Sequence, residues 1–296
     1  GKAGIIRFSF SDVAAMNYRH HFHAGNFADV MKHSLQMGLL AALKKKDTAF
    51  CFIDTHAGAG IYDLHGMQAQ KTGEYQQGIE RITDHRGAPA WVAEYLQSIL
   101  ACQAAGGRSH YPGSPWLGLR QLRAQDRAIF MDVQHAEVAS LRHYFKDDAR
   151  VAVHQRNAYE GLNAMIPPKE KRGLVLIDPP YELERDAFPQ LVKLIVAAHT
   201  KWPTGVYAIW FPIKQRTAIV KFYRELMNSG IPKMLACELL MQPDDNALGL
   251  NGSGLIVINP PWGFYEEAQK TLAWLLDRLS DHPQKSSKVR WLANIE

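Results

Sequence analysis

The sequence predicts an α/β fold built on a seven-stranded, mostly parallel sheet, with helices on both faces and a small helical insertion. Three observations indicate this fold. Short apolar runs are typical of strands that are buried on both faces, and they alternate along the chain with helical patterns. Two of the runs also end abruptly in an aspartate followed by glycines or prolines, as strands do at the ligand-binding edge of open α/β sheets.

The composition is that of a soluble globular protein, with 47% hydrophobic and 21% charged residues among 296. The net charge of +5, together with 13 histidines, favours a polyanionic partner. Three scattered cysteines, Cys51, Cys102 and Cys237, argue against a disulfide framework and predict a reducing cytoplasm. No apolar run reaches the roughly 18 residues of a membrane-spanning helix. No signal peptide is recognisable, so no membrane association is expected.

The chain begins with a segment, residues 1–15, that has no clear pattern and is interpreted as an extension before a native start at Met16. An aromatic and basic cluster follows, and no nearby carboxylate or thiolate completes a metal site there. Cationic and aromatic side chains together are typical of nucleic-acid contacts, with a plain surface segment as the alternative. The candidate RNA-binding residues are Tyr18, Arg19 and His20.

A helix is expected to begin after Asn26, a good N-cap, with Asp29 in its first turn and lysines 44–46 at its negative end. Its apolar residues recur at helical spacing and predict a buried stripe. A polar face carries Asn26, Asp29 and His33, which suggests a site, although a solvated face is the alternative. The buried stripe consists of Phe27, Val30, Met31, Leu35, Leu39 and Leu43.

The first strand is expected over residues 49–53, followed by the sequence D-T-H-A-G-A-G from Asp54 to Gly60. An acid and glycines after a strand form a turn in which a nucleotide-like ligand can approach the backbone. The dinucleotide pattern G-x-G-x-x-G is absent, which disfavours a nicotinamide enzyme.

Residues 61–111 do not continue the alternation, because residues 74–103 have a helical pattern that is interrupted at 85–89. We therefore expect a helical insertion at 61–111 in a larger domain made of residues 16–60 and 112–296. Basic side chains of the insertion can reach phosphate, although scattered charges are solvated by default. These residues are Lys71, Arg81, Arg86 and Arg108.

The alternation resumes at Ser114, a candidate N-cap with Pro115 at the first helical position, so that this helix begins at the ligand. The next strand, residues 128–131, ends in Asp132. An acid at this place suits a bidentate grip on ribose hydroxyls.

A strand over residues 151–154 leads to Asn157 and Ala158, which either read an adenine edge or form an ordinary loop. After the central strand, which is expected over residues 174–177, the pattern predicts two helices and three more strands. The helices span residues 188–198 and 216–227, and the strands span residues 205–211, 234–241 and 254–259.

The central strand, residues 174–177, ends in Asp178, Pro179, Pro180 and Tyr181. Proline cannot continue a strand ladder, so Asp178 is held at the carboxyl end of the strand. A carboxylate and a backbone carbonyl can accept hydrogen bonds from the two N–H groups of an exocyclic amine. These hydrogen bonds free the lone pair of the amine nitrogen. An aromatic face next to them supports a flipped-out base. The alternative is a strand that simply ends in a proline turn.

Asp-Pro-Pro-Tyr resembles the catalytic motif of S-adenosylmethionine-dependent amino-methyltransferases. The turn from Asp54 to Gly60 (the glycine turn) resembles motif I of these enzymes, with His56 where glycine is more usual. Nearly the whole chain from Met16 is similar to the bacterial 23S ribosomal RNA adenine-N6 methyltransferases of the RlmJ type. The strings H-A-G-N-F-A-D-V-M-K-H and D-T-H-A-G-A-G are long and unusual. The similarity rests on residues 17–33, 54–60, 111–114, 178–181 and 259–262.

This resemblance implies a Rossmann-like class I methyltransferase that acts on adenine N6 of 23S ribosomal RNA. It also implies that the enzyme converts S-adenosylmethionine to S-adenosylhomocysteine, needs no metal, and is a monomer that acts before ribosome assembly is complete. Asp178 would accept from the amine, in a site completed by Pro179, Pro180 and Tyr181, and Tyr18 would contact RNA. The cofactor would be held by His33, His56, Gly58, Gly60, Ser114, Asp132, Asn157, Ala158 and Asp178.

Two positions depart from the pattern of this family, which has glutamate where this chain has Asp132 and aspartate where it has Asn157. The shorter side chain of Asp132 can still accept hydrogen bonds from the ribose hydroxyls. Asn157 removes a charge near adenine but keeps the capacity to hydrogen-bond.

A second sequence of similar kind, Asn259-Pro260-Pro261-Trp262, follows the last predicted strand. Topology argues against it as the catalytic copy, because the reacting base must meet the turn after the first strand. In a methyltransferase sheet the fourth strand, here residues 173–178, lies beside the first. We therefore expect Asn259 to end a strand near the rim.

Two other functions stay open. A DNA adenine methyltransferase is the nearest, since the same four residues serve both polymers, but neither a second DNA-reading domain nor a helix-turn-helix is apparent. A non-catalytic RNA-binding module on the same fold is the alternative of another class. A protein-glutamine methyltransferase is disfavoured, because that family prefers Asn-Pro-Pro-Tyr at the fourth strand.

Overall fold

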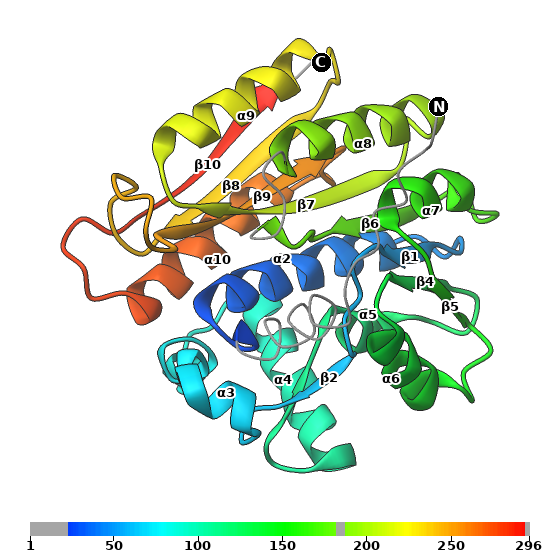
Figure 1. Cartoon of the computed structure of the whole chain (residues 1–296), viewed down its shortest axis with the longest axis horizontal. Helices are drawn as coiled ribbons and strands as arrows, with labels where there is room; N and C mark the ends of the chain where they lie inside the picture. The colour runs from blue at the N-terminus through cyan, green and yellow to red at the C-terminus, as the bar shows by residue number, and fades with distance from the viewer. Residues whose placement is uncertain (1–22, 182–186, 294–296) are drawn as a thin grey trace, which may run out of the picture.

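The structure is a computed structural model that describes residues 23–181 and 187–293. Within these ranges the main sheet has eight strands in the order β10-β8-β9-β7-β6-β1-β4-β5, and β2 and β3 form a separate small sheet (Figure 1). The predicted start at Met16 and the predicted RNA contacts Tyr18, Arg19 and His20 lie outside the described residues. They stay predictions.

Five parallel strands form the centre and one side of the sheet. β1 (Cys51–Asp54) lies between β4 (Arg127–Asp132) and β6 (Gly173–Ile177), with β5 (Val151–Gln155) beyond β4 and β7 (Val206–Ile213) beyond β6. Every side chain of β1 and β6 is buried, which explains their continuous apolar sequences. The carboxyl ends of β1 and β6 are neighbours, so the predicted adjacency of these two strands is confirmed.

The other side of the sheet contains antiparallel pairs. β9 (Gly252–Ile258) runs antiparallel to β7 and to β8 (Met234–Leu240), and β10 (Ser286–Ala293) pairs antiparallel with β8 at the edge. The predicted number of seven strands is therefore wrong by one. β10 has no continuous apolar run, because it is an edge strand on which charged residues such as Lys288 and Arg290 alternate with apolar ones.

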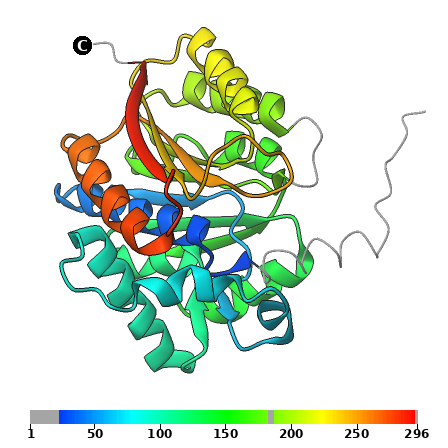
Figure 2. The same cartoon turned by 90° about the vertical axis from the view of Figure 1, so that its left-hand side faces the viewer.

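Helices cover both faces of the sheet, and each face has its own cluster of buried apolar side chains. Figure 2 shows the sheet between the two helical layers. One face is covered by α2 (Phe27–Lys44), α5 (Ser114–Gln121), α6 (His135–Phe145) and α10 (Phe264–Leu279), and the other by α7 (Ala158–Met165), α8 (Ala187–Lys201) and α9 (Arg216–Asn228).

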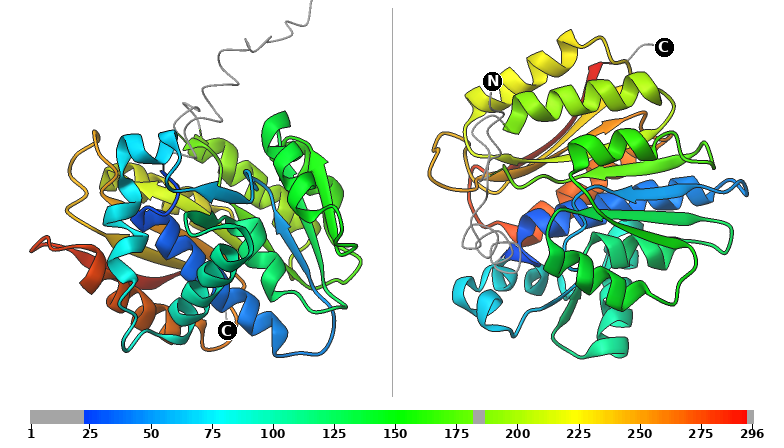
Figure 3. Two further views of the ribbon diagram at one scale, coloured as in Figure 1. Left: turned by 90° about the horizontal axis from the view of Figure 1, so that it is seen from below. Right: turned by 45° about the vertical axis from the view of Figure 1, so that its right-hand side comes forward.

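Residues 61–111 begin and end in a short ladder outside the main sheet, in which β2 (Ile61–Asp63) pairs antiparallel with β3 (His110–Pro112). This ladder is not part of the predicted helical pattern. It brings the two ends of the segment together. The intervening helices are α3 (Met67–Thr72), α4 (Ala90–Gly106) and the 3-10 helices η1 (Glu74–Gln77) and η2 (Ile79–Ile82). Of these helices, α4 packs on α2 and α5, η1 packs on α2, and η2 packs on α10 (Figure 3).

α2 begins as predicted, because the Asn26 side chain accepts a hydrogen bond from the Asp29 backbone N–H at 2.9 Å. Its polar face is buried, so the alternative of a solvated face is wrong. Asn26, Asp29, Lys32 and His33 are 8%, 6%, 4% and 2% exposed. Buried polar side chains are costly without partners, so this face has to contact polar groups of other elements.

Gly118 lets α5 approach β1 closely. A Cβ atom at this position would lie 2.0 Å from Cε1 of Phe52, a fully buried ring that packs edge-on against Phe130. We expect Gly118→Ala to lower the free energy of unfolding by about 1–3 kcal/mol, because overpacking outweighs the gain in helix propensity. Chemical denaturation followed by circular dichroism measures this change. Thr217→Ala, at an exposed position of α9, serves as the control, and an equally stable Gly118→Ala variant would contradict the packing.

Candidate active site

The turn after β1 is held between the two neighbouring strands. The Thr55 N–H donates to the Leu176 carbonyl of β6 at 3.1 Å, and the Ala57 N–H donates to the Met131 carbonyl of β4 at 2.9 Å. Gly58 has a left-handed backbone, with φ of 66°. The acid-and-glycine sequence therefore forms a tight turn at the carboxyl edge of the sheet.

Ser114 connects α5 to this turn. The Gly113 N–H donates to the carbonyl of Gly60, whose φ is 87°, at 2.8 Å. The Ser114 hydroxyl donates to Asp54 Oδ2 at 2.6 Å. The prediction that Ser114 is the N-cap is wrong: Gly113 is the N-cap and Ser114 the first helical residue, because the Ser114 hydroxyl is engaged by the carboxylate.

Asp54 is fully buried at the end of β1. Its Oδ1 atom has no hydrogen-bond partner in the part of the chain that the structure describes. Burial raises the pKa of Asp54 to about 7, and the Ser114 hydroxyl and the Lys32 ammonium oppose this rise only in part. A buried carboxylate with an open oxygen beside a glycine turn is suited to accept from a cationic group of a ligand.

Asp132 is the last residue of β4, at the strand end that the sequence predicts, and its carboxylate supports the glycine turn. Oδ2 accepts from the Gly58 N–H at 3.0 Å, and Oδ1 accepts from the Gln134 N–H at 2.9 Å. A carboxylate oxygen can accept two hydrogen bonds, so Asp132 retains capacity for a ribose.

His56 is close enough to two carboxylates to interact electrostatically with both. Burial lowers the pKa of His56, and the negative charges of Asp132 and Asp178 oppose this shift without cancelling it. Its Nδ1 atom lies 2.8 Å from Thr55 Oγ1. The imidazole is therefore neutral near pH 7.

Asp178 follows β6, and a buried lysine holds its carboxylate. Lys32 Nζ lies 2.5 Å from Asp178 Oδ2 and 3.1 Å from Asp29 Oδ1. The side chains of Lys32 and Asp178 are 5% and 14% exposed. Burial disfavours the ammonium, but Asp178 and Asp29 outweigh this effect and raise the pKa of Lys32 above its ordinary value.

Lys32 is a site residue that the sequence patterns missed. The polar face of α2 was defined by the spacing of Asn26, Asp29 and His33, and Lys32 lies between the last two on the same side of the helix. A lysine three residues after Asp29, on a helix with a long apolar stripe, is the signal that could have identified it. Its partner Asp178 is 146 residues away in the sequence.

Tyr181 is anchored on β7 and α8. Its N–H donates to the Pro179 carbonyl at 3.0 Å, and its hydroxyl donates to the Trp210 carbonyl. The ring packs against Phe188 and Trp210 with centroids 5.3 and 5.7 Å apart. Tyr181 is half-buried, so a part of its surface stays accessible for stacking.

His33 belongs to a chain of buried polar groups. Its Nδ1 atom lies 2.8 Å from the Tyr111 hydroxyl, which lies 2.6 Å from the Tyr95 hydroxyl. Both tyrosines are fully buried, and burial raises the pKa of each well above its ordinary value. Tyr95 lies in α4 and Tyr111 in β3, so residues 61–111 contact the predicted cofactor face of α2.

Asn157 and Ala158 lie beyond the end of β5. The Asn157 side chain caps α7 by accepting from the Tyr159 N–H at 2.8 Å, and Ala158 is the first helical residue. The cap uses the amide oxygen, so the amide nitrogen of Asn157 keeps its donors for a ligand.

The sequence Asn259-Pro260-Pro261-Trp262 lies at the opposite ends of the parallel strands from Asp178. β9 is antiparallel to β7, so Asn259 follows the end of β9 beside the start of β7. Its amide donates to the carbonyls of Pro203 and Gly205, each at 2.8 Å. Trp262 is 95% exposed. Asn259 therefore ends a strand away from the turn after β1, as topology predicted.

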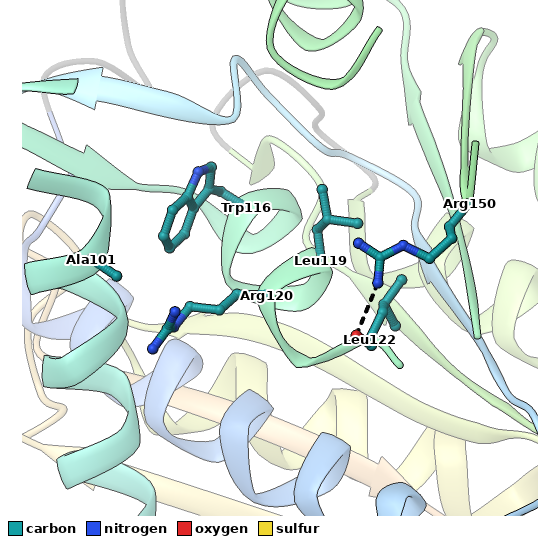
Figure 4. A pocket seen from close by; sticks show the side chains of 6 residues that line it. All are labelled: Ala101, Trp116, Leu119, Arg120, Leu122 and Arg150. Atoms are coloured by element: carbon teal, nitrogen blue, oxygen red, sulfur yellow. Dashed lines mark hydrogen bonds between the residues drawn. The ribbon is translucent and has the colours of Figure 1, made fainter. Parts of the chain in front are cut away.

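A hollow between α4, α5 and the start of β5 lies apart from these residues (Figure 4). Arg150 lines it and donates to the Leu122 carbonyl at 2.9 Å, and Arg120 donates to Ser98 Oγ at 3.2 Å. None of the predicted cofactor or catalytic residues lines this hollow. Its arginines stabilise loops and helix contacts.

Among residues 23–181 and 187–293, no group of three histidine, cysteine or acidic side chains is arranged to bind a metal ion. Within the same residues, no helix has both the length and the apolar character that crossing a membrane requires. The three cysteines are buried and unpaired.

Known proteins resemble this chain along most of its length. A family model described as "Ribosomal RNA large subunit methyltransferase D, RlmJ" matches residues 47–293. The chain belongs to this family. Two relatives named "Ribosomal RNA large subunit methyltransferase J" are similar to this RlmJ-family protein. The one from Haemophilus influenzae is 40% identical over 278 residues, and the one from Escherichia coli is 38% identical over 277. Each match covers 94% of this chain and 99% of the relative.

A crystal structure of protein LPL1258 from Legionella pneumophila has a TM-score of 0.81 to this RlmJ-family protein. It is 33% identical in sequence, and the match covers 90% of this chain and 98% of that one. The resemblance inferred from the motifs is thus confirmed at the level of the family. The sheet, with β1 between β4 and β6, has the Rossmann-like strand order in its parallel half, and β10 lies at its outer edge.

The raised pKa of Asp54 predicts a pH-dependent effect of Asp54→Asn. Between pH 5 and pH 8 the folded carboxyl releases its proton, which the unfolded chain has already lost, so ionisation of Asp54 destabilises the fold as pH rises. We expect Asp54→Asn to be more stable relative to wild type at pH 8 than at pH 5, by about 2–3 kcal/mol. Chemical denaturation across this range tests it. Asp147→Asn, at an exposed position, is the control, and a pH-independent difference would contradict the assignment.

Proposed function

We propose that this RlmJ-family protein transfers the methyl group of S-adenosylmethionine to the N6 amine of an adenine in 23S ribosomal RNA. The observation that carries the proposal is the Asp-Pro-Pro-Tyr turn, in which Lys32 holds Asp178 at the end of β6, next to the glycine turn that follows β1. The printed names of the two curated relatives support a ribosomal RNA substrate. The net charge of +5 also suits a polyanion.

The residues around the glycine turn have the donor and acceptor types that this cofactor needs. When bound, the cofactor supplies a methyl group on a positively charged sulfonium sulfur. Asp54, whose Oδ1 is open, would accept from its amino group, Asp132 would accept from its ribose, and the Asn157 amide would donate to its adenine. The others that would line the cofactor are His33, His56, Gly58, Gly60, Ser114, Ala158 and Asp178.

Asp178 and Pro179 orient the reacting amine in this proposal. Lys32 occupies Oδ2 of Asp178, so Oδ1 accepts one hydrogen of N6. The Pro179 carbonyl accepts the other with the lone pair that the Tyr181 N–H does not use. The nitrogen is thereby drawn toward tetrahedral geometry, and Pro180 stiffens the turn. As the bond between N6 and the methyl carbon forms, the bond from that carbon to sulfur would break, and N6 would release one proton through Asp178 to water.

Positioning supplies much of the rate in such a site, because holding two reactants in line contributes about 7–11 kcal/mol. Tyr181 is fixed by its hydroxyl and by two ring contacts, so it offers a stationary face for an unstacked base. Lys32 holds the carboxylate that meets the amine, so Asp178 does not have to reorganise during the reaction.

The variant Asp178→Ala tests the catalytic assignment. We expect methyl transfer to fall by about 10²–10⁴-fold, because the amine loses its acceptor, while binding of S-adenosylhomocysteine persists. Transfer of a radioactive methyl group to 23S RNA and calorimetric titration measure the two quantities. Asn259→Ala, in the sequence at the opposite edge, is the matched control, with thermal melts to verify folding. Full activity of Asp178→Ala together with loss in Asn259→Ala would reverse the choice of motif.

The substrate is tested with the wild-type protein. Incubation with deproteinised 23S RNA or with duplex DNA, followed by nuclease digestion and mass spectrometry, is expected to give N6-methyladenine in the RNA. Methylation of DNA alone would replace the RNA substrate by the DNA alternative. Absence of methylation together with absence of cofactor binding would leave the non-catalytic RNA-binding module.

A further inference from the structure

We infer that Tyr95, acting through Tyr111, fixes the tautomer of His33 so that the neutral imidazole carries its proton on Nε2. Both tyrosines are positioning residues that belong to the segment 61–111. The inference rests on the proposed function in one respect, since it treats His33 as a ligand of the cofactor.

The three side chains form one continuous buried chain from three elements. His33 of α2, Tyr111 of β3 and Tyr95 of α4 are joined by distances of 2.8 Å from Nδ1 to the first hydroxyl and 2.6 Å between the hydroxyls. They are 2%, 0% and 0% exposed. The imidazole also contacts both phenol rings, with centroids 5.7 Å and 5.9 Å away. Packing therefore leaves the ring no freedom to exchange its two nitrogens by turning over.

The number of protons in this row of hydrogen-bonded side chains decides which group donates in each hydrogen bond. Burial raises the pKa of both phenols, so each hydroxyl keeps its single proton. Within residues 23–181 and 187–293, Tyr95 makes no hydrogen bond other than the one to Tyr111. If Tyr95 donates to Tyr111, then Tyr111 donates to His33 Nδ1 and every hydroxyl proton has an acceptor. The reverse direction leaves the Tyr95 proton buried without an acceptor, which is disfavoured.

Nδ1 of His33 is therefore an acceptor, and the proton of the neutral ring lies on Nε2. The doubly protonated ring is disfavoured for the same reason, because it would force Tyr111 to accept and Tyr95 to lose its acceptor. A neutral imidazole suits a site for a sulfonium cofactor, since an imidazolium would repel the positive sulfur. His33 thus carries its single N–H on Nε2 and adds no charge to the site.

Tyr95→Phe is the discriminating variant, because it removes one oxygen atom two groups away from the imidazole. Long-range ¹⁵N–¹H correlation spectra of histidine-labelled protein report the tautomer, and His33→Gln assigns the signals. We expect the Nε2–H form in the wild type and a mixture of forms in Tyr95→Phe. The dissociation constant of S-adenosylhomocysteine should rise by about threefold to tenfold, more at pH 6 than at pH 8. Tyr207→Phe is the matched control, since its buried hydroxyl bonds to carbonyls on the other face of the sheet.

An Nδ1–H or doubly protonated His33 in the wild type at pH 7 would overturn the inference without any variant. Equal spectra and equal affinities of Tyr95→Phe and Tyr207→Phe would also overturn it. If the wild type shows the Nε2–H tautomer but binds no S-adenosylhomocysteine, the proposed function fails while the proton order in the chain stands. The two failures are therefore distinguishable.

Discussion

A buried ammonium group organises the site of this RlmJ-family protein. Lys32 lies between Asp29 on its own helix and Asp178 at the end of β6, and it is almost fully shielded from water. A buried ion pair adds little to stability in comparison with apolar packing, but removing one partner leaves an uncompensated charge. Its main effect is therefore geometric. The pair fixes α2 against the central strand and holds one oxygen of the Asp178 carboxylate, so the other oxygen has a defined position.

Three carboxylates, each at the end of a neighbouring strand, come together at this edge of the sheet, and each is stabilised differently. Asp178 has the lysine, Asp132 has two backbone N–H groups, and Asp54 has a serine hydroxyl and a raised pKa. Like charges in one site are tolerated only when their environments differ. Among residues 23–181 and 187–293, the site holds more acceptors than fixed cations. This surplus favours a ligand that carries positive charge, and a sulfonium with an amino group has this character.

The sequence was informative where a structure depends on local chemistry. Apolar runs that are buried on both faces identified β1 and β6, the Asn26 cap identified the start of α2, and the prolines identified the end of β6. Contacts between distant segments left no such pattern. The partners Lys32 and Asp178 are 146 residues apart, and His33 and Tyr111 are 78 apart. The sequence does not predict β10, because an edge strand is half polar. It predicts Ser114 as a helix cap, because the contact of its hydroxyl with Asp54 of β1 leaves no local pattern.

The segment 61–111 is more than an addition to the surface, because both of its ends enter the site. The β2–β3 ladder pairs Ile61 with Pro112, directly after Gly60 and directly before Gly113, and these two glycines are themselves hydrogen-bonded. Because the two ends of the segment meet in this ladder, Gly60 and Gly113 are held beside each other. It also delivers Tyr111 to His33 from within the ladder and Tyr95 from the helix above it. The ladder that joins the two ends of the segment therefore also couples the packing of the segment to the proton on His33.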